Sequence, residues 1–173
     1  VTAAYPSGGY NGFYLQTAGT GSEIGDASHG IFVYMGSGAG NVEVGDYVEV
    51  TGTAGEFNNL TQISGSPTVT QLEDVVEAPT PVAVTEADLL TEAGRERLEG
   101  MIIDFSEVDL TVTDTYNTNQ YAEVALALGD APLATSTDIY NPVTEKAAHD
   151  ALVADNANRM LVLDDASTAN YMT

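Results

Sequence analysis

The chain has 173 residues, 43% of them hydrophobic, and 26 acidic side chains against four Lys and Arg give a formal net charge of −22. The hydrophobic content argues against a disordered chain, and no apolar run approaches the ~20 residues of a membrane-spanning helix, so we expect a soluble protein with no membrane partner. The lack of a basic cluster predicts weak or absent nucleic-acid binding, because non-specific binders gain affinity when Lys and Arg release counterions.

Short strands are expected along the first half of the chain, where β-branched and aromatic residues alternate with turns rich in Gly, Asn and Asp. The strand candidates are residues 12–16, 30–35, 47–53 and 60–64. In the third of these, Val48 and Val50 alternate with polar side chains, as a half-buried antiparallel strand requires. Residues 55–59 are expected to turn the chain back into the fourth strand. This pattern predicts a compact β-barrel over residues 1–72.

A second β unit is expected over residues 85–173, after an acidic, proline-bracketed linker at residues 73–84. Thr85 followed by acidic residues predicts the start of a short helix, and another short helix is expected over residues 144–155. The remaining strand candidates are residues 101–105, 110–114, 121–126 and 160–163. We expect this unit to be incomplete at its C-terminal end, where further strands would be needed to close a second barrel.

Several short sequence segments are distributed along nearly the whole chain, at residues 5–9, 11–16, 30–34, 44–46, 50–52, 56–63, 98–101, 110–114 and 161–165. In this order they resemble the region that precedes the catalytic domain in large secreted bacterial nucleases of the endonuclease/exonuclease/phosphatase superfamily. The resemblance implies a mainly β fold, with an OB-type barrel followed by a second, OB-like β unit that carries one or two short helices. It also implies a secreted, extracellular or cell-surface protein whose partner is a downstream catalytic domain of the same polypeptide.

No catalytic site is expected within this chain, because the resemblance places the family's catalytic residues in the downstream domain. His29 precedes a strand and His149 lies in an expected surface helix. One histidine in each unit leaves neither with an expected nucleophile partner, and the GxSxG, P-loop and HExxH motifs are absent from the sequence. We therefore predict a non-catalytic accessory region that needs no cofactor and that positions the enzyme or attaches it to a substrate or surface.

Calcium is the cation that the acidic composition suits, because it prefers carboxylate and amide oxygens. Asp114, Asn117 and Asn119 place three such side chains in one loop, although their spacing is not that of an EF-hand. The alternative interpretation of this loop is a solvated turn rich in Asx residues.

Aromatic residues of the first unit are candidates for the base-stacking platform that OB-folds use for single strands. Phe13 and Phe32 are central to their strands and are expected in the core. Tyr14, Tyr34 and Phe57 are therefore the candidates for exposed stacking residues.

A structural or adhesive extracellular role is the alternative function. Unpaired strand edges in an unfinished second barrel would be templates for added strands. Under this alternative, neighbouring copies of the chain are the expected partners, and they would assemble into oligomers or fibres by strand complementation.

Overall fold

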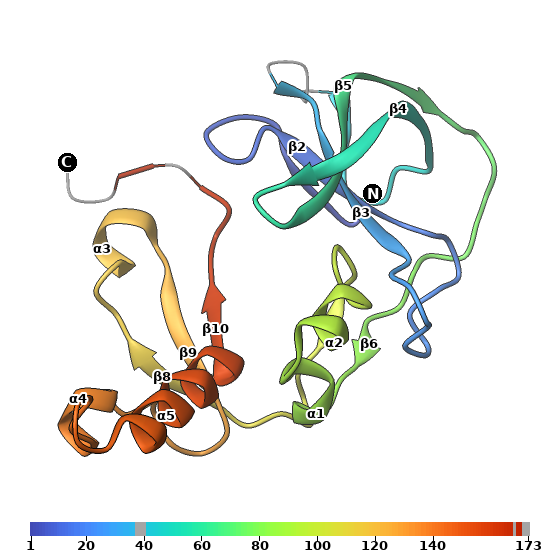
Figure 1. Ribbon diagram of the computed structural model, residues 1–173. Helices are drawn as coiled ribbons and strands as arrows, with labels where there is room; N and C mark the ends of the chain where they lie inside the picture. Colours follow the sequence, from blue (N-terminus) through green and yellow to red (C-terminus); the bar gives the residue numbers. More distant parts are fainter. Residues whose placement is uncertain (37–40, 168, 171–173) are drawn as a thin grey trace. The chain divides into compact units, whose positions relative to one another are not determined.

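The computed structural model describes residues 1–36, 41–167 and 169–170, and it divides into two compact units (Figure 1). Unit 1 comprises Val1–Ala83, Arg95–Asp104 and Ala166–Ala169, whereas unit 2 comprises Val84–Gly94, Phe105–Asp165 and the segment that begins at Asn170. Several sheets and a few mostly short helices make up the two units. The mainly β fold class expected from the sequence is confirmed.

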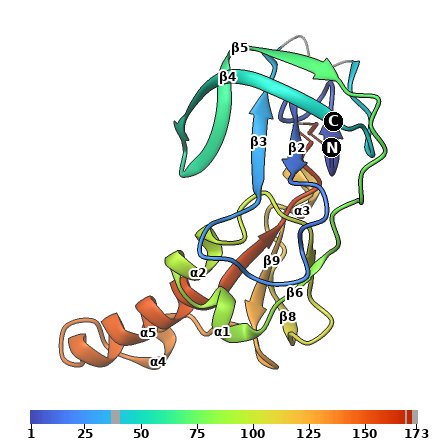
Figure 2. The same cartoon turned by 90° about the vertical axis from the view of Figure 1, so that its right-hand side faces the viewer.

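Five strands of unit 1 form one sheet in the order β1-β2-β3-β5-β4, with β4 and β5 visible as a long curved ribbon (Figure 2). They are β1 (Ala3–Tyr5), β2 (Gly12–Gln16), β3 (Gly30–Tyr34), β4 (Val48–Phe57) and β5 (Leu60–Gln71). Neighbouring strands pair antiparallel except β3 and β5, which pair parallel. Five strands is the number that an OB-type barrel has, and the OB-type barrel expected for the first unit stays a prediction.

Strand register gives this sheet a core face and an aromatic-rich face. Phe13 lies opposite Val33, and both side chains are fully buried. A second row lies one residue away along each strand. In this row Tyr14 lies opposite Phe32, and Phe32 lies opposite Gln62. Because successive side chains of a strand point to opposite faces, the second row lies on the face away from the Phe13 core.

The β4–β5 hairpin has a shorter turn than the sequence predicted. Phe57 pairs with Leu60, so only Asn58 and Asn59 connect the strands, with φ values of 52° and 63°. Two-residue hairpin loops of the favoured twist need positive φ at both positions, and Asn tolerates that conformation better than most residues. The strand therefore continues through residues 55–57, where a turn was expected.

Unit 1 also contains a two-stranded parallel sheet of β6 (Val82–Ala83) and β7 (Ile103–Asp104). The segment that leads into β7 is held by Glu99, whose carboxylate accepts a hydrogen bond from the backbone N–H of Thr61 at 3.2 Å. The backbone carbonyl of Glu99 accepts another from the Ser28 hydroxyl at 2.5 Å.

The observed division differs from the one expected from the sequence, which was a first unit at 1–72, a linker at 73–84 and a second unit at 85–173. Residues 95–104 and 166–169 were expected in the second unit but belong to unit 1. These segments join unit 1 through hydrogen bonds between residues far apart in sequence. Such bonds leave no local pattern from which the assignment could be predicted.

Unit 2 contains an antiparallel sheet in the order β10-β9-β8, formed by β8 (Leu110–Asp114), β9 (Val124–Leu128) and β10 (Met160–Leu163). Ala127 and Leu128 of β9 are fully buried. The helices of unit 2 are α1 (Glu86–Leu89), α3 (Thr118–Tyr121), α4 (Ser136–Ile139) and α5 (Lys146–Arg159). The division between the units falls within α2 (Glu92–Glu96), after Gly94. Among the described residues, none of the helices combines the length and apolarity needed to cross a membrane.

Helix positions in unit 2 follow the sequence in part. α1 begins directly after Thr85, whose backbone N–H donates to the Asp88 carboxylate at 2.9 Å, as a capping interaction does. The 14-residue α5 is longer than the helix expected over residues 144–155. Tyr121 ends α3 instead of starting a strand, because Ala122 takes a left-handed conformation with φ of 58° and closes the helix.

Candidate functional site

The three residues predicted for stacking share one face of the unit 1 sheet. Tyr14 and Tyr34 lie on adjacent strands. Tyr14 of β2 lies opposite Phe32 of β3. Tyr34 comes two residues after Phe32 and therefore shares its face. Tyr34 lies opposite Gly12, so no side chain covers it from the neighbouring strand.

Phe57 shares this face by register, although it lies on β4. Phe32 lies opposite Gln62, and Gln62 lies opposite Gly55. Phe57 follows Gly55 by two residues, so its side chain points to the same side of the sheet. We call Tyr14, Phe32, Tyr34 and Phe57 the aromatic face.

Tyr14 is engaged in packing instead of being free to stack. Its ring centroid lies 4.9 Å from that of Phe32 and 6.4 Å from that of Tyr5. Tyr10 completes a circuit of four rings, with centroids 6.0 Å from Tyr5 and 6.3 Å from Phe32. These are edge-to-face and tilted geometries, which aromatic pairs prefer. The circuit buries Phe32, which is 3% exposed, as the sequence predicted.

Tyr34 and Phe57 remain available to a ligand, at 43% and 61% exposure. Gly55, two residues before Phe57 on β4, faces open space, because a Cβ placed there would meet no atom within 4 Å. Gly12 is the opposite case, since a Cβ there would lie 2.2 Å from the carbonyl oxygen of Val33. By register, Tyr34 lies two positions after Phe32, whereas Phe57 is level with Gly30, two positions before Phe32. The two exposed rings of the aromatic face therefore flank the packed pair of Tyr14 and Phe32.

Electrostatics around the aromatic face are those of an acidic surface. Residues 1–83 contain no Lys or Arg, and of the four cations in the chain only Arg95 and Arg97 belong to unit 1. Neither lies in a strand of the aromatic face. A polyanion would find no Lys or Arg on these strands, and the weak nucleic-acid binding expected from the charge stays a prediction.

The residues predicted for calcium lie around the start of α3 in unit 2. Asp114 ends β8, and its carboxylate accepts a hydrogen bond from the Tyr116 N–H at 2.8 Å, as in an Asx turn. Asn117 precedes α3 and donates to the Glu123 carboxylate at 2.8 Å. Asn119 is exposed within α3. Among the described residues, no group of three or more His, Cys, Asp and Glu side chains could hold a metal, so a calcium site that uses the two amides stays a prediction.

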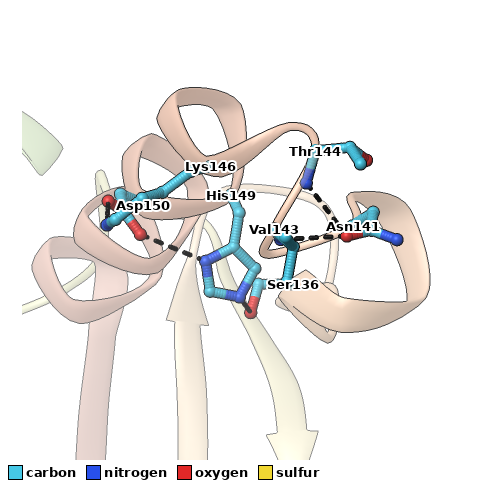
Figure 3. Close-up of polar contacts among 7 residues, drawn as sticks. All are labelled: Ser136, Asn141, Val143, Thr144, Lys146, His149 and Asp150. Atoms are coloured by element: carbon cyan, nitrogen blue, oxygen red, sulfur yellow. Dashed lines mark hydrogen bonds and ion pairs between the residues drawn. The ribbon is translucent and has the colours of Figure 1, made fainter.

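His149 has a hydroxyl partner that sequence reasoning did not predict (Figure 3). Its Nε2 lies 3.2 Å from Ser136 Oγ, and its Nδ1 lies 3.2 Å from the Asp150 carboxylate. Lys146 donates to the same carboxylate. The hydrogen bonds from Lys146 and then from His149 hold the pKa of Asp150 below its usual value. No local signal predicts the Ser136 contact, because it joins α4 to α5 across a loop. His29, in contrast, is exposed just before β3, as expected.

The His149 contacts fasten a helical hairpin. Asn141 lies in the loop between α4 and α5, and its side-chain oxygen accepts hydrogen bonds from the N–H groups of Val143 and Thr144 at 2.9 and 3.1 Å (Figure 3). The order Ser136, His149, Asp150 has the connectivity of a hydrolase triad. However, the Asp150 side chain is 52% exposed and is shared with Lys146. Because solvent screens this carboxylate, its electrostatic support of His149 as a general base would be weak.

No protein-family model, curated protein or solved structure matches the chain.

Proposed function

We propose that the chain is a non-catalytic accessory region of a secreted, nuclease-type polypeptide and that the aromatic face of unit 1 attaches this polypeptide to a substrate or surface. The single observation that best supports the proposal is the register that puts the exposed rings of Tyr34 and Phe57 on one face of the sheet. In OB-folds, the face of strands 2 and 3 is where oligonucleotides and oligosaccharides bind.

The charge distribution favours a neutral ligand. Stacking on exposed rings needs no charge, whereas binding to a polyanion would depend on cations that residues 1–83 do not contain. Among the ligands that OB-folds bind, a neutral oligosaccharide therefore fits this face better than a nucleic acid does.

Tyrosine fluorescence provides the test, because the chain has nine Tyr and no Trp. We would titrate the protein with neutral hexasaccharides and with a 15-nucleotide oligo-dT at physiological salt. Tyr34→Ala and Phe57→Ala should each weaken saccharide binding by about tenfold, which is the effect of ~1.4 kcal/mol of lost stacking. Tyr116→Ala is the matched control, since Tyr116 is 89% exposed and belongs to unit 2.

Equal binding by the wild type and by both aromatic-face variants would contradict the proposal. So would the failure of every neutral saccharide in the panel to bind. Tighter binding of oligo-dT than of any saccharide would overturn the charge argument and would favour a role in holding the nucleic-acid substrate.

A further inference from the structure

The two exposed rings of the aromatic face lie on a diagonal across three strands, with Gln62 between them. In the sheet, β5 separates β3 from β4. Relative to the row that contains Gln62, Tyr34 of β3 lies two residues to one side and Phe57 of β4 lies two residues to the other. Side chains two residues apart on a strand share a face. Tyr34, Gln62 and Phe57 therefore form a line on one side of the sheet.

This line is too long for a small ligand to span. Tyr34 and Phe57 differ by two plus two residues along the strands and by two strand spacings across them. At about 3.3 Å per residue and about 4.8 Å per strand, the two positions are roughly 16 Å apart. A pyranose unit is about 5 Å long, since it is built from bonds of roughly 1.5 Å. A disaccharide can therefore contact only one of the two rings, whereas a chain of about four sugars reaches both.

The middle of the line carries a polar group that suits a sugar. Gln62 is half-buried, and no hydrogen bond joins its side chain to another described residue. An amide both donates and accepts hydrogen bonds, as hydroxyl groups do. The residue opposite Gln62 on β4 is Gly55, so no side chain of β4 covers the amide at that position. The amide is thus available to a ligand that lies along the line.

This part of the sheet is free of charge in a strongly acidic chain. Along β2, β3, β4 and β5, every residue in the rows of Tyr34, Gln62 and Phe57 is uncharged. Glu56 lies between Gly55 and Phe57 and so points to the other face, where it accepts a hydrogen bond from the Thr61 hydroxyl. With a net charge of −22, an uncharged row pattern on this face is complementary to a ligand without charge.

We propose that the aromatic face binds one extended, neutral polysaccharide chain, with one sugar stacked on Tyr34, another on Phe57 and an intervening sugar hydrogen-bonded to Gln62. This inference rests on the proposed function and names its ligand, a chain of at least about four neutral sugars. Once one ring holds the chain, the other ring binds it at a high effective concentration. Affinity should therefore rise steeply with chain length until both rings are covered.

Calorimetry with oligosaccharides of cellulose and of starch, from two to seven sugars long, tests this dependence. For at least one type, the hexasaccharide should bind the wild type at least about tenfold more tightly than the disaccharide, with little further gain at seven sugars. In Tyr34→Ala and in Phe57→Ala this ratio should fall to about one, because a single ring remains. Tyr116→Ala, in unit 2, is the matched control and should keep the wild-type ratio.

Gln62→Ala tests the path of the chain between the rings. It should weaken hexasaccharide binding by about fivefold, the effect of one lost hydrogen bond, and leave disaccharide binding unchanged. Gln71→Ala, on the same strand, is the matched control, and circular dichroism would confirm that all variants are folded.

The possible failures are distinguishable. Equal wild-type affinities for disaccharide and hexasaccharide, with binding still lost in the ring variants, would overturn this inference and leave the proposed function intact. An unchanged hexasaccharide affinity in Gln62→Ala would overturn the placement of the chain over Gln62. The absence of binding by every oligosaccharide would overturn this inference together with the proposed function.

Discussion

The side chain of Gln16 holds the backbone of Ile102, which lies 86 positions later in the sequence. Gln16 Oε1 accepts a hydrogen bond from the Ile102 N–H at 2.9 Å, and Gln16 itself is only 8% exposed. The bond fastens β2 to the segment that enters β7, so it helps to make residues 95–104 part of unit 1.

Gln16→Met should lower the free energy of unfolding by about 1–3 kcal/mol, because the partly buried N–H of Ile102 loses its acceptor. Urea denaturation measures this loss. Gln71→Met is the control, since Gln71 is exposed and its side chain donates to the Asp46 carboxylate at the surface. Equal losses in the two variants would show that the Gln16 bond has no special role.

Gly12→Ala should destabilise unit 1 by about 1–3 kcal/mol, which is the usual cost of overpacking. The added Cβ would lie 2.2 Å from the Val33 carbonyl oxygen and 2.5 Å from the Phe32 ring, so backbone or ring must move. Gly55→Ala, on the same face of the sheet, meets no atom within 4 Å and should change stability by no more than about 0.5 kcal/mol. Thermal unfolding of the two variants should differ accordingly, and a reversed order would contradict this packing.

Phe32→Ala should cost about 3–5 kcal/mol, as expected for a buried aromatic side chain. Phe32 is 3% exposed and contacts the rings of Tyr10 and Tyr14. Phe57→Ala, at a site that is 61% exposed, should change stability by less than about 0.5 kcal/mol. A large loss in Phe57→Ala would mean that this ring is part of a core and is not available to a ligand.

Asp150→Asn should reduce stability at neutral pH but not in acid. Hydrogen bonds from Lys146 and His149 lower the pKa of Asp150 in the folded chain below the ordinary value of 3.8. A lowered folded-state pKa stabilises the protein above the unfolded-state pKa, and this contribution disappears as pH falls through the folded-state pKa. The difference between wild type and variant in urea unfolding should therefore shrink as pH drops below 3.8. Asp130→Asn, which replaces an exposed carboxylate outside this network, is the matched control.

Ser136 should not react with a fluorophosphonate probe, because we propose that its contact with His149 joins α4 to α5 and does not serve catalysis. Ser136→Ala should instead lower stability by about 0.5–1.5 kcal/mol, the typical net contribution of one hydrogen bond. Intact-mass analysis after probe treatment checks the first expectation, and urea unfolding checks the second. Labelling at Ser136 that His149→Ala abolishes would refute the proposed non-catalytic role.

Local patterns predicted several elements closely. The strands at residues 12–16, 110–114 and 160–163 have the predicted bounds, and the helix after Thr85 begins where its cap indicates. These features depend on alternation and on capping chemistry, which act between residues a few positions apart. Elements whose bounds depend on distant partners were predicted less well. β5, for example, extends to Gln71 because β4 pairs with it along that length.

The sequence by itself determined the mainly β character of the chain, its acidic charge and the absence of Lys and Arg from residues 1–83. It could not determine that Tyr34 and Phe57 share a face, that His149 meets Ser136, or that residues 95–104 join unit 1. Only the tertiary structure decided these relationships. The physical reason is that strand register and long-range hydrogen bonds are set by pairing between distant segments, and a shift of one residue would have turned every side chain of a strand to the opposite face.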